Sequence, residues 1–471
     1  MKKDDIEKIT RRTFLASVPV AASVPLLRGT GARTLASPAP AANAGGAAVG
    51  AALALNGGTP VRTTVLNTSC PGSQFYDQHE QELTDEAIAT HGLFRWYGPE
   101  GRPQPVKVAT FEKEFAEILG VKYVHAITSG TAALHTALTA LGVGPGDEVI
   151  LPAWTWYSCY YAIVMTGALP VFAENDDSFT IDPADVERKI TPQTKVIMPV
   201  HLFGSPSNMD AIMEIARRHN VKVLEDSAQN AGGSYKGKRT STIGDIGIFS
   251  FQLHKMITAG EGGAIATNDP ELYERAVRFS DLGLLRPPSV AKMGKGTMPF
   301  WLGVNYRMNE MTGAVMLAQA RKLDNILAEQ RKRGGYVLER VSRIPGIKMR
   351  RSNDYNGELH LTVDLILSSQ ALRDDFLKAM KAENVPMERP SAAVILPAQP
   401  PIANKAVPHP AWPSFNSPRG KEIRYGAESV PRSMEIFNRT ATLTVGPKYT
   451  TQDLDDIVAA INKVYQALVL S

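Results

Sequence analysis

The sequence predicts an α/β fold, with a mostly parallel sheet flanked by helices in a large domain and a smaller C-terminal α+β domain. From about residue 56 onward, short apolar runs alternate with stretches whose apolar residues recur at helical spacing. Strands that alternate with helices are typical of a parallel sheet with helices on both faces. The length of 471 residues also exceeds what one simple core uses. We therefore expect a signal and linker at 1–55, a large domain at 56–320 and a small domain at 321–471.

Each predicted strand is a short apolar run next to a turn or a helical pattern. The first, 148–152, follows a turn that Gly144, Pro145 and Gly146 favour. The same pattern predicts strands at 169–172, 195–200 and 221–225.

The predicted helices carry start and stop signals. The pattern at 111–119 ends at Gly120, and the helix at 182–190 begins with Asp182 as a cap before Pro183. The stretch 394–428 instead holds seven prolines, which predicts a long surface loop of the kind that sets specificity. Further helices are predicted at 157–166, 209–220, 321–341 and 453–468.

The composition excludes several classes of protein. Hydrophobic residues make up 44% and charged residues 21%, as in an ordinary soluble globular protein. The net charge of +4 is too small to indicate nucleic-acid binding. Cys70 and Cys159 cannot form a disulfide framework, although a single bridge between them stays open. No cluster of His, Cys and carboxylate residues has the spacing of a metal site, and we expect no metal.

The N-terminal segment has the order of a twin-arginine export signal. Arg11 and Arg12 are followed by Phe14 and Leu15, and then by an apolar stretch at 16–27 that prolines interrupt. This stretch is too short and too broken to span a bilayer stably. We expect a periplasmic or extracytoplasmic protein. The alternatives are a chance arginine pair in a disordered tail and a cytoplasmic protein.

Two charged residues indicate the chemistry. Lys255 lies shortly before the glycine-rich sequence Gly260-Glu-Gly-Gly263, and Asp226 closes the apolar run at 221–225. A lysine in such a turn can hold an aldehyde cofactor as a Schiff base, and a carboxylate at a strand end can keep a pyridine nitrogen protonated. Together they predict pyridoxal 5'-phosphate as the cofactor.

A phosphate site is predicted where a helix begins after the apolar run at 123–127. Gly130 lets the backbone approach an anion closely, and the free N–H groups of the helix start can bind it together with the Thr131 hydroxyl. Ser250 precedes Lys255 by five positions and can add a second hydroxyl. Such a turn is common in proteins and is weak evidence by itself. Because it occurs together with Lys255 and Asp226, it predicts binding of the cofactor phosphate.

Five motifs along the chain occur together and in a fixed order. They are Ser129-Gly-Thr-Ala-Ala-Leu134, Val200-His-Leu-Phe-Gly204, Glu225-Asp-Ser-Ala-Gln229, Phe249-Ser-Phe-Gln-Leu-His-Lys255 with Gly260-Glu-Gly-Gly263, and Asn305-Tyr-Arg-Met308. With them the chain resembles the DegT/DnrJ/EryC1/StrS family of sugar aminotransferases, which are fold-type I pyridoxal phosphate enzymes. The likeness runs from Asn56 to the C-terminal helix. Gly57-Gly-Thr-Pro-Val-Arg62 and Gln252 look more like the branch that acts on cyclitols or aminohydroxybenzoate-type rings.

The resemblance implies roles for four residues around the cofactor ring. Lys255 would form the internal aldimine and then act as the general base that moves a proton between carbons, with a pKa that burial beside a cation lowers. Asp226 would pair with the pyridinium nitrogen, and Gln229 would lie near the ring hydroxyl. Trp156 would stack on the ring, with a core aromatic as the alternative.

The resemblance also implies how the phosphate is held. Gly130, Thr131 and Ser250 would bind it from the same chain. Asn305 would reach it from the neighbouring subunit, which implies a homodimer with shared active sites.

We therefore expect an aminotransferase that moves an amino group from glutamate or glutamine to a keto-sugar or keto-cyclitol. One alternative is a pyridoxal phosphate sugar dehydratase, but family members with that activity carry histidine where this chain has Lys255. Another is a non-catalytic exported protein that binds the cofactor or a sugar in a sensory role, which the intact Lys255, Asp226 and Ser250 disfavour. An export signal is unusual for this family, whose nucleotide-sugar substrates are cytoplasmic, so the usual substrate is in doubt.

Overall fold

The computed structural model describes residues 52–67 and 72–470, apart from residues 288, 290, 291, 293, 295, 297, 299, 300 and 392. All of them belong to one compact unit, 47–471. The arginine pair of the predicted export signal and Cys70 lie outside the described residues.

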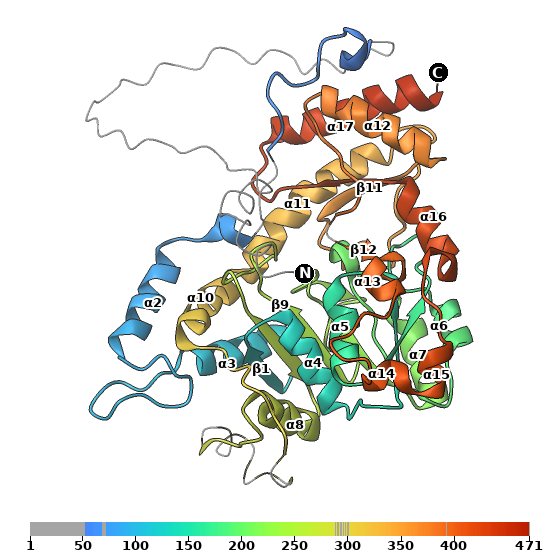
Figure 1. Ribbon diagram of the computed structural model, residues 1–471. Coiled ribbons are helices and arrows are strands. Elements are labelled where there is room, and N and C mark those ends of the chain that lie inside the picture. Colours follow the sequence, from blue (N-terminus) through green and yellow to red (C-terminus); the bar gives the residue numbers. More distant parts are fainter. Residues whose placement is uncertain are drawn as a thin grey trace, which may run out of the picture. The chain divides into compact units, whose positions relative to one another are not determined.

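The core of the described part is a seven-stranded sheet (Figure 1). Its strands are β1 (Tyr123–Ile127), β2 (Glu148–Pro152), β4 (Leu169–Ala173), β5 (Thr194–Ile197), β6 (Lys222–Asp226), β9 (Ile246–Ser250) and β10 (Gly263–Thr267). They follow the order β1-β10-β9-β6-β5-β2-β4. β10 runs antiparallel to both of its neighbours, and the other strands all point in one direction. The predicted α/β fold with a mostly parallel sheet is confirmed.

Helices cover both faces of this sheet. They are α3 (Lys107–Leu119), α4 (Gly130–Ala140), α5 (Tyr157–Met165), α6 (Pro183–Lys189), α7 (Met209–His219), α8 (Pro270–Ser280) and α10 (Glu310–Arg321), and α2 (Gln78–Ala89) packs against α10. Successive strand residues point to opposite faces. On β2, Val149 and Leu151 therefore pack in the layer of α4, α5 and α8, whereas Ile150 packs in the layer of α6 and α7. On β10, Ile265 joins the first layer, while Ala264 packs with α3 and α10.

The C-terminal part has a hydrophobic cluster of its own. Its elements are β11 (Thr362–Ile366), β13 (Thr440–Thr444), α11 (Leu323–Val341), α12 (Gln370–Ala382) and α17 (Thr451–Tyr465). Leu53 and Leu66 are buried in the same cluster, and the Ala54 N–H donates to the Glu383 carboxylate at 2.9 Å. Residues 53–66 therefore pack on the C-terminal elements, although they precede the sheet in sequence. The predicted division of the chain at residue 320 stays a prediction.

Several shorter elements complete the described part. They are η2 (Ala54–Asn56), η3 (Gly72–Phe75), η4 (Leu202–Gly204), η5 (Leu396–Ala398), η6 (Ala427–Ser429), η7 (Gln466–Leu470), β3 (Trp154–Thr155), β7 (Ser234–Tyr235), β8 (Lys238–Arg239), β12 (Val394–Ile395), α13 (Pro400–Ala403), α14 (Pro413–Asn416), α15 (Pro418–Glu422) and α16 (Pro431–Arg439).

The proline-rich stretch lies largely at the surface, as predicted, but it is not an irregular loop, because it forms short helices and is attached to β3, α5 and β4. We call residues 394–425 the strap. Within it, Pro400, Pro413 and Pro418 each begin a short helix, because a proline at the first helical position loses no hydrogen bond. These three prolines therefore mark helix starts. The buried apolar residues of the strap include Ile402 of α13 and, outside the three helices, Ile395, Leu396 and Tyr425.

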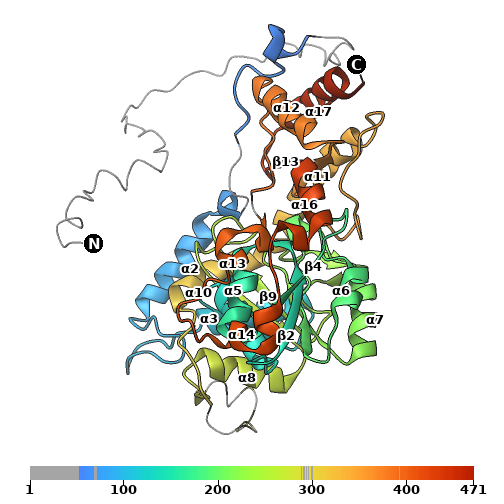
Figure 2. The same ribbon diagram turned by 45° about the vertical axis from the view of Figure 1, so that its right-hand side comes forward.

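The strap is attached to the sheet by hydrogen bonds as well as by apolar contacts. β12 pairs with β3 in antiparallel register. The Trp412 indole N–H donates to the Val164 carbonyl of α5, and the Tyr425 hydroxyl donates to the Pro170 carbonyl of β4, each at 2.7 Å. Figures 1 and 2 both show the strap helices α13 and α14 beside α5.

Candidate active site

The fold brings most of the predicted site residues to one edge of the sheet. Asp226 is the last residue of β6 and Ser250 the last of β9, while Gly130 begins the helix that follows β1. Because these strands are parallel, their carboxyl ends lie at the same edge, where ligands of open α/β sheets bind. Lys255 lies in the turn between β9 and the start of β10, at the same edge.

The predicted phosphate site is a close approach of two backbone segments. A Cβ atom added to Gly130 would lie 2.7 Å from the Ser250 Cβ, so only glycine fits there. The Ser129 hydroxyl accepts a hydrogen bond from the Ala132 N–H at 3.1 Å and caps α4. The N–H groups of the first helical turn have no intrahelical partner, so this helix start can receive an anion. The geometry fits a phosphate beside the Ser250 hydroxyl.

Thr131 is paired with a residue that the sequence did not indicate. Its hydroxyl lies 2.7 Å from the Ser158 hydroxyl in the first turn of α5. The beginnings of α4 and α5 therefore meet at this pair, and both helices present their N-terminal ends there.

Asp226 is a buried carboxylate with both oxygens engaged. Its Oδ1 accepts from the Ala228 N–H at 2.8 Å, and its Oδ2 accepts from the Cys159 thiol at 3.3 Å. Burial raises the pKa of the Asp226 carboxyl, while these two donors and the charge of Lys255 act in the opposite direction. A cationic ring nitrogen beside it would further favour the ionised carboxylate.

Lys255 is partly buried in a turn that hydrogen bonds hold in shape. Its N–H donates to the Gln252 carbonyl at 2.9 Å, and the Leu253 N–H donates to the Gly260 carbonyl at 3.1 Å. Burial lowers the pKa of the Lys255 amine, and the charge of Asp226 opposes that shift. A lowered pKa increases the neutral fraction of the amine, which is the form that can accept a proton.

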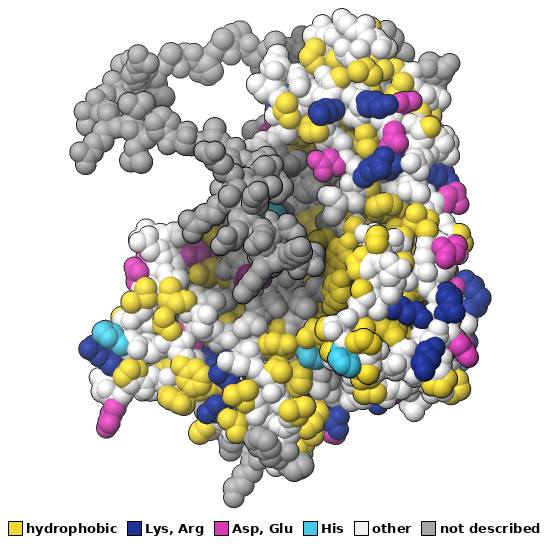
Figure 3. Space-filling view, viewed as in Figure 1, with side chains coloured by type: hydrophobic (Ala, Val, Ile, Leu, Met, Phe, Trp, Pro, Cys, Tyr) yellow, Lys and Arg dark blue, Asp and Glu magenta, His cyan; other side chains and the backbone are white. Residues whose placement is uncertain are grey.

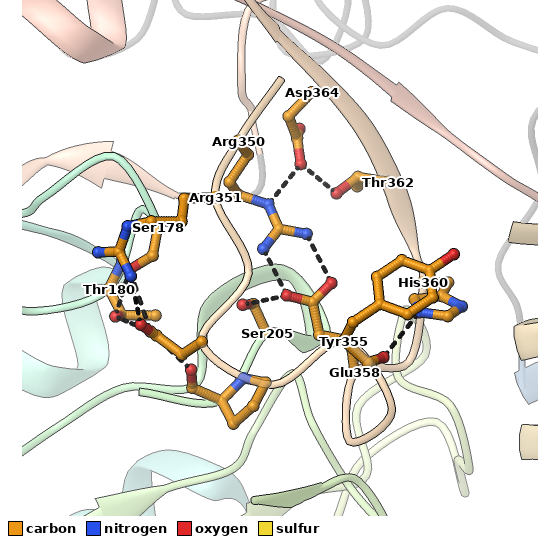
Figure 4. A network of polar contacts seen from close by, with 12 residues as sticks. Ser178, Thr180, Ser205, Arg350, Arg351, Tyr355, Glu358, His360, Thr362 and Asp364 are labelled. Carbon is orange, nitrogen blue, oxygen red and sulfur yellow. Dashed lines mark hydrogen bonds and ion pairs between the residues drawn. The ribbon is translucent and has the colours of Figure 1, made fainter. Parts of the chain in front are cut away.

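Gln229 holds the turn that follows β5. Its Oε1 accepts from the Phe203 N–H at 2.9 Å, and Phe203 has a left-handed backbone with φ 53°. Figure 4 shows how this turn is supported: the Ser205 hydroxyl donates to Glu358 at 2.7 Å, and Arg350 bridges Glu358 to the β11 carboxylate Asp364. The C-terminal elements are thus connected to the turn that Gln229 holds.

Trp156 and Asn305 are exposed side chains. Trp156 precedes α5 with 47% of its surface exposed, and its ring meets the Tyr157 ring edge-on at 5.5 Å. It is therefore not the core aromatic of the alternative interpretation. Asn305 lies in a segment beside the end of β1, where the Thr128 N–H donates to the Tyr306 carbonyl at 2.9 Å. The stacking role of Trp156 and the phosphate role of Asn305 stay predictions.

Two residues near the site were missed by the sequence argument. Ser158 and Cys159 contact Thr131 and Asp226, respectively. Both follow Trp156 within the first turn of α5, and such a turn places consecutive side chains on different sides. Their position next to Trp156 in sequence was the only indication that they lie near the site. Polar residues in a helical turn are too common for that position to identify them. Among the described residues there is no group of His, Cys, Asp and Glu that could hold a metal ion.

A family model describes most of this region. The DegT/DnrJ/EryC1/StrS aminotransferase family model matches residues 101–405, which contain every predicted site residue. This chain belongs to the DegT/DnrJ/EryC1/StrS aminotransferase family. It is therefore a pyridoxal phosphate-dependent aminotransferase, and the dehydratase and sensory alternatives are not supported.

Named relatives and solved structures agree with this assignment. The chain is 40% identical to GDP-perosamine synthase of Caulobacter vibrioides over 275 residues. This alignment covers 57% of this chain and 68% of the relative. It is 32% identical over 369 residues to a putative L-glutamine:3-amino-2,3-dideoxy-scyllo-inosose aminotransferase of Micromonospora echinospora. This alignment covers 75% of this chain and 85% of the relative. The crystal structure of 3-amino-5-hydroxybenzoic acid synthase matches with a TM-score of 0.68 at 27% identity, covering 83% of this chain and 97% of that one.

The residues at the sheet edge fit the cofactor of the family. When bound, pyridoxal phosphate supplies an electron-withdrawing ring that stabilises negative charge on a substrate carbon. Gly130, Thr131 and Ser250 would hold its phosphate, and Asp226 would hold the proton of the ring nitrogen by charge pairing. Lys255 Nζ, as the neutral amine, would take up the substrate proton and return it at another atom.

Proposed function

We propose that this aminotransferase moves an amino group from glutamate or glutamine to a keto-sugar or a keto-cyclitol. The relatives support both acceptor classes, because one is named for an aminosugar product and another for a glutamine-dependent reaction on an inosose. The observation that carries the proposal is that Lys255 and Asp226 lie at the same sheet edge as the phosphate site formed by Gly130 and Ser250. Which acceptor is used is the question that the experiment answers.

Absorption spectroscopy of the purified protein tests this proposal. Addition of glutamate or glutamine should replace the absorption band of the bound aldehyde cofactor by one at shorter wavelength, and a keto-sugar or keto-cyclitol acceptor should restore it. Lys255→Ala is the matched control and should show no such cycle. A wild-type band that ignores every amino donor would contradict the proposal.

We further propose that the protein works as a homodimer with shared active sites. Trp156, which precedes α5, and Tyr161 and Met165 of α5 have 38–47% of their surfaces exposed, and Figure 3 shows hydrophobic side chains gathered on this face of the molecule. Exposed apolar surface of this kind is typical of protein interfaces. Lys255→Ala and Asn305→Ala are complementary variants, because a mixed dimer rebuilds one intact site. Mixing two weakly active variants should therefore restore activity, and no gain after mixing would contradict a shared site.

We also propose that the protein is exported. The support is the order of Arg11, Arg12, Phe14 and Leu15 before an apolar stretch. No helix among the described residues is long and apolar enough to cross a membrane. Fractionation of cells that express the full chain should place it outside the cytoplasm, and Arg11→Lys with Arg12→Lys should retain it inside. An unchanged distribution of the double variant would reject the signal.

A further inference from the structure

The first turn of α5 contacts the one carboxylate on which the proposed function depends. Cys159 is fully buried, and its Sγ lies 3.3 Å from Asp226 Oδ2. The Thr155 hydroxyl lies 3.3 Å from the same sulfur. Neither residue belongs to the sequence motifs of the site, and no role for Cys159 follows from the reaction itself.

The direction of these hydrogen bonds follows from the chemistry of the partners. An ionised carboxylate can only accept, so the thiol must donate to Asp226. With its proton committed, the sulfur accepts from the Thr155 hydroxyl, and a chain of donors runs from Thr155 through Cys159 to Asp226. Burial and the neighbouring negative charge raise the pKa of the Cys159 thiol well above its usual value, which keeps the proton on the sulfur.

We propose that Cys159 is a positioning residue for Asp226, which its thiol orients and holds as a carboxylate opposite the cofactor ring nitrogen. The inference rests on the proposed function. The Ala228 N–H holds the other carboxylate oxygen, so the two donors together prevent rotation of the group. Hydrogen bonds to an ionised acceptor favour the charged form, and the charged form is the one that can pair with a protonated ring.

The strap contributes to this arrangement from a distant part of the chain. Val394 of β12 pairs with Thr155 of β3, and the Tyr157 hydroxyl donates to Gln399 at 3.0 Å. The backbone on both sides of Trp156 is therefore attached to the strap. The position of the Thr155 hydroxyl, and with it the acceptor state of the sulfur, depends on residues about 240 positions later in sequence.

Two substitutions separate hydrogen bonding from packing. Cys159→Ala removes the donor, and Cys159→Ser keeps a donor of similar size. Titration of each cofactor-free protein with pyridoxal phosphate should show a dissociation constant about tenfold higher for Cys159→Ala, equal to about 1.4 kcal/mol, and nearly unchanged for Cys159→Ser. Wild-type affinity in Cys159→Ala, or equal losses in both variants, would overturn the positioning role.

The pH dependence of the bound cofactor gives a second readout that a purely structural role would not move. The titratable groups that face Asp226 are Cys159, Lys255 and His201. Loss of the thiol donor should make the protonated ring titrate away at lower pH in Cys159→Ala than in wild type or Cys159→Ser. An identical titration in all three proteins would contradict the proposal.

A cofactor-free measurement keeps the inference separate from the proposed function. In a Cys70→Ser background, the S–H stretching band in the infrared reports on Cys159 alone. It should be shifted by the carboxylate acceptor and move back toward the free-thiol position in Asp226→Asn. A free-thiol band in the parent protein would overturn the contact, even if Cys159→Ala does not fold. If the protein binds no pyridoxal phosphate but shows the shifted band, the proposed function fails and the Cys159–Asp226 contact stands.

Discussion

Replacement of Gly130 by alanine tests the phosphate cradle most directly. The added Cβ would lie 2.7 Å from the Ser250 Cβ, about 0.7 Å short of the 3.4 Å at which ordinary contact begins. Overpacking of this kind costs about 1–3 kcal/mol. If the first turn of α4 moves away to relieve it, the donors move off the phosphate, and the dissociation constant of pyridoxal phosphate rises roughly 5- to 150-fold. Helix propensity alone predicts that Gly130→Ala stabilises the protein, because alanine is favoured over glycine in a helix by about 1 kcal/mol.

The assay is titration of the cofactor-free variant with pyridoxal phosphate, together with urea unfolding of the same sample. Gly144→Ala is the matched control, since a Cβ at Gly144 meets nothing within 4 Å, and it should behave as wild type. In Gly130→Ala with Ser250→Gly, the nearest remaining atom is the Ser250 Cα at 3.4 Å. That double variant should regain stability but not affinity. Wild-type affinity and stability in Gly130→Ala would refute the reasoning.

Three other outcomes follow from buried charges. Arg350→Met leaves Glu358 and Asp364 without their countercharge and should lower the free energy of unfolding by about 3–5 kcal/mol, whereas Arg351→Met at an exposed ion pair should cost about 0–1 kcal/mol. Equal losses in urea unfolding would contradict this. In the cofactor-free protein, Lys255→Met should raise stability at neutral pH, because burial lowers the pKa of Lys255 and unfolding lets the amine take up a proton. The wild-type protein gains stability as pH rises toward the ordinary pKa of lysine, so the stability advantage of Lys255→Met should shrink over that range. A difference in melting temperature between the two proteins that stays constant with pH would contradict this prediction. Asp226→Asn removes the charge opposite the ring nitrogen and should lower kcat/KM about ten- to a hundredfold, the effect of losing a hydrogen bond to a charged group. A variant as active as wild type in steady-state assays would exclude that charge pairing.

The sequence was sufficient to predict a mostly parallel sheet and the strand that Asp226 closes. Apolar runs that alternate with helical patterns predict parallel strands, and the carboxyl ends of parallel strands share an edge whatever their order. Asp226 closes a predicted strand, but the strand that ends at Ser250 was not predicted, and only the structure shows that β6 and β9 are neighbours. The helix start at Gly130 was predicted separately, from the apolar run at 123–127 that precedes it.

The contacts that adjust this site depend on tertiary structure. Cys159 meets Asp226 across 67 positions of sequence, and Thr131 meets Ser158 across 27. Neither pair has a spacing that a helix or a strand produces. Even the prolines of the strap, which predict a loop, include three that begin short helices, and one of these helices buries Ile402. Strand ends follow from local hydrophobic patterns and connectivity, whereas the partner of a buried polar group is decided by which distant segment fills the space beside it.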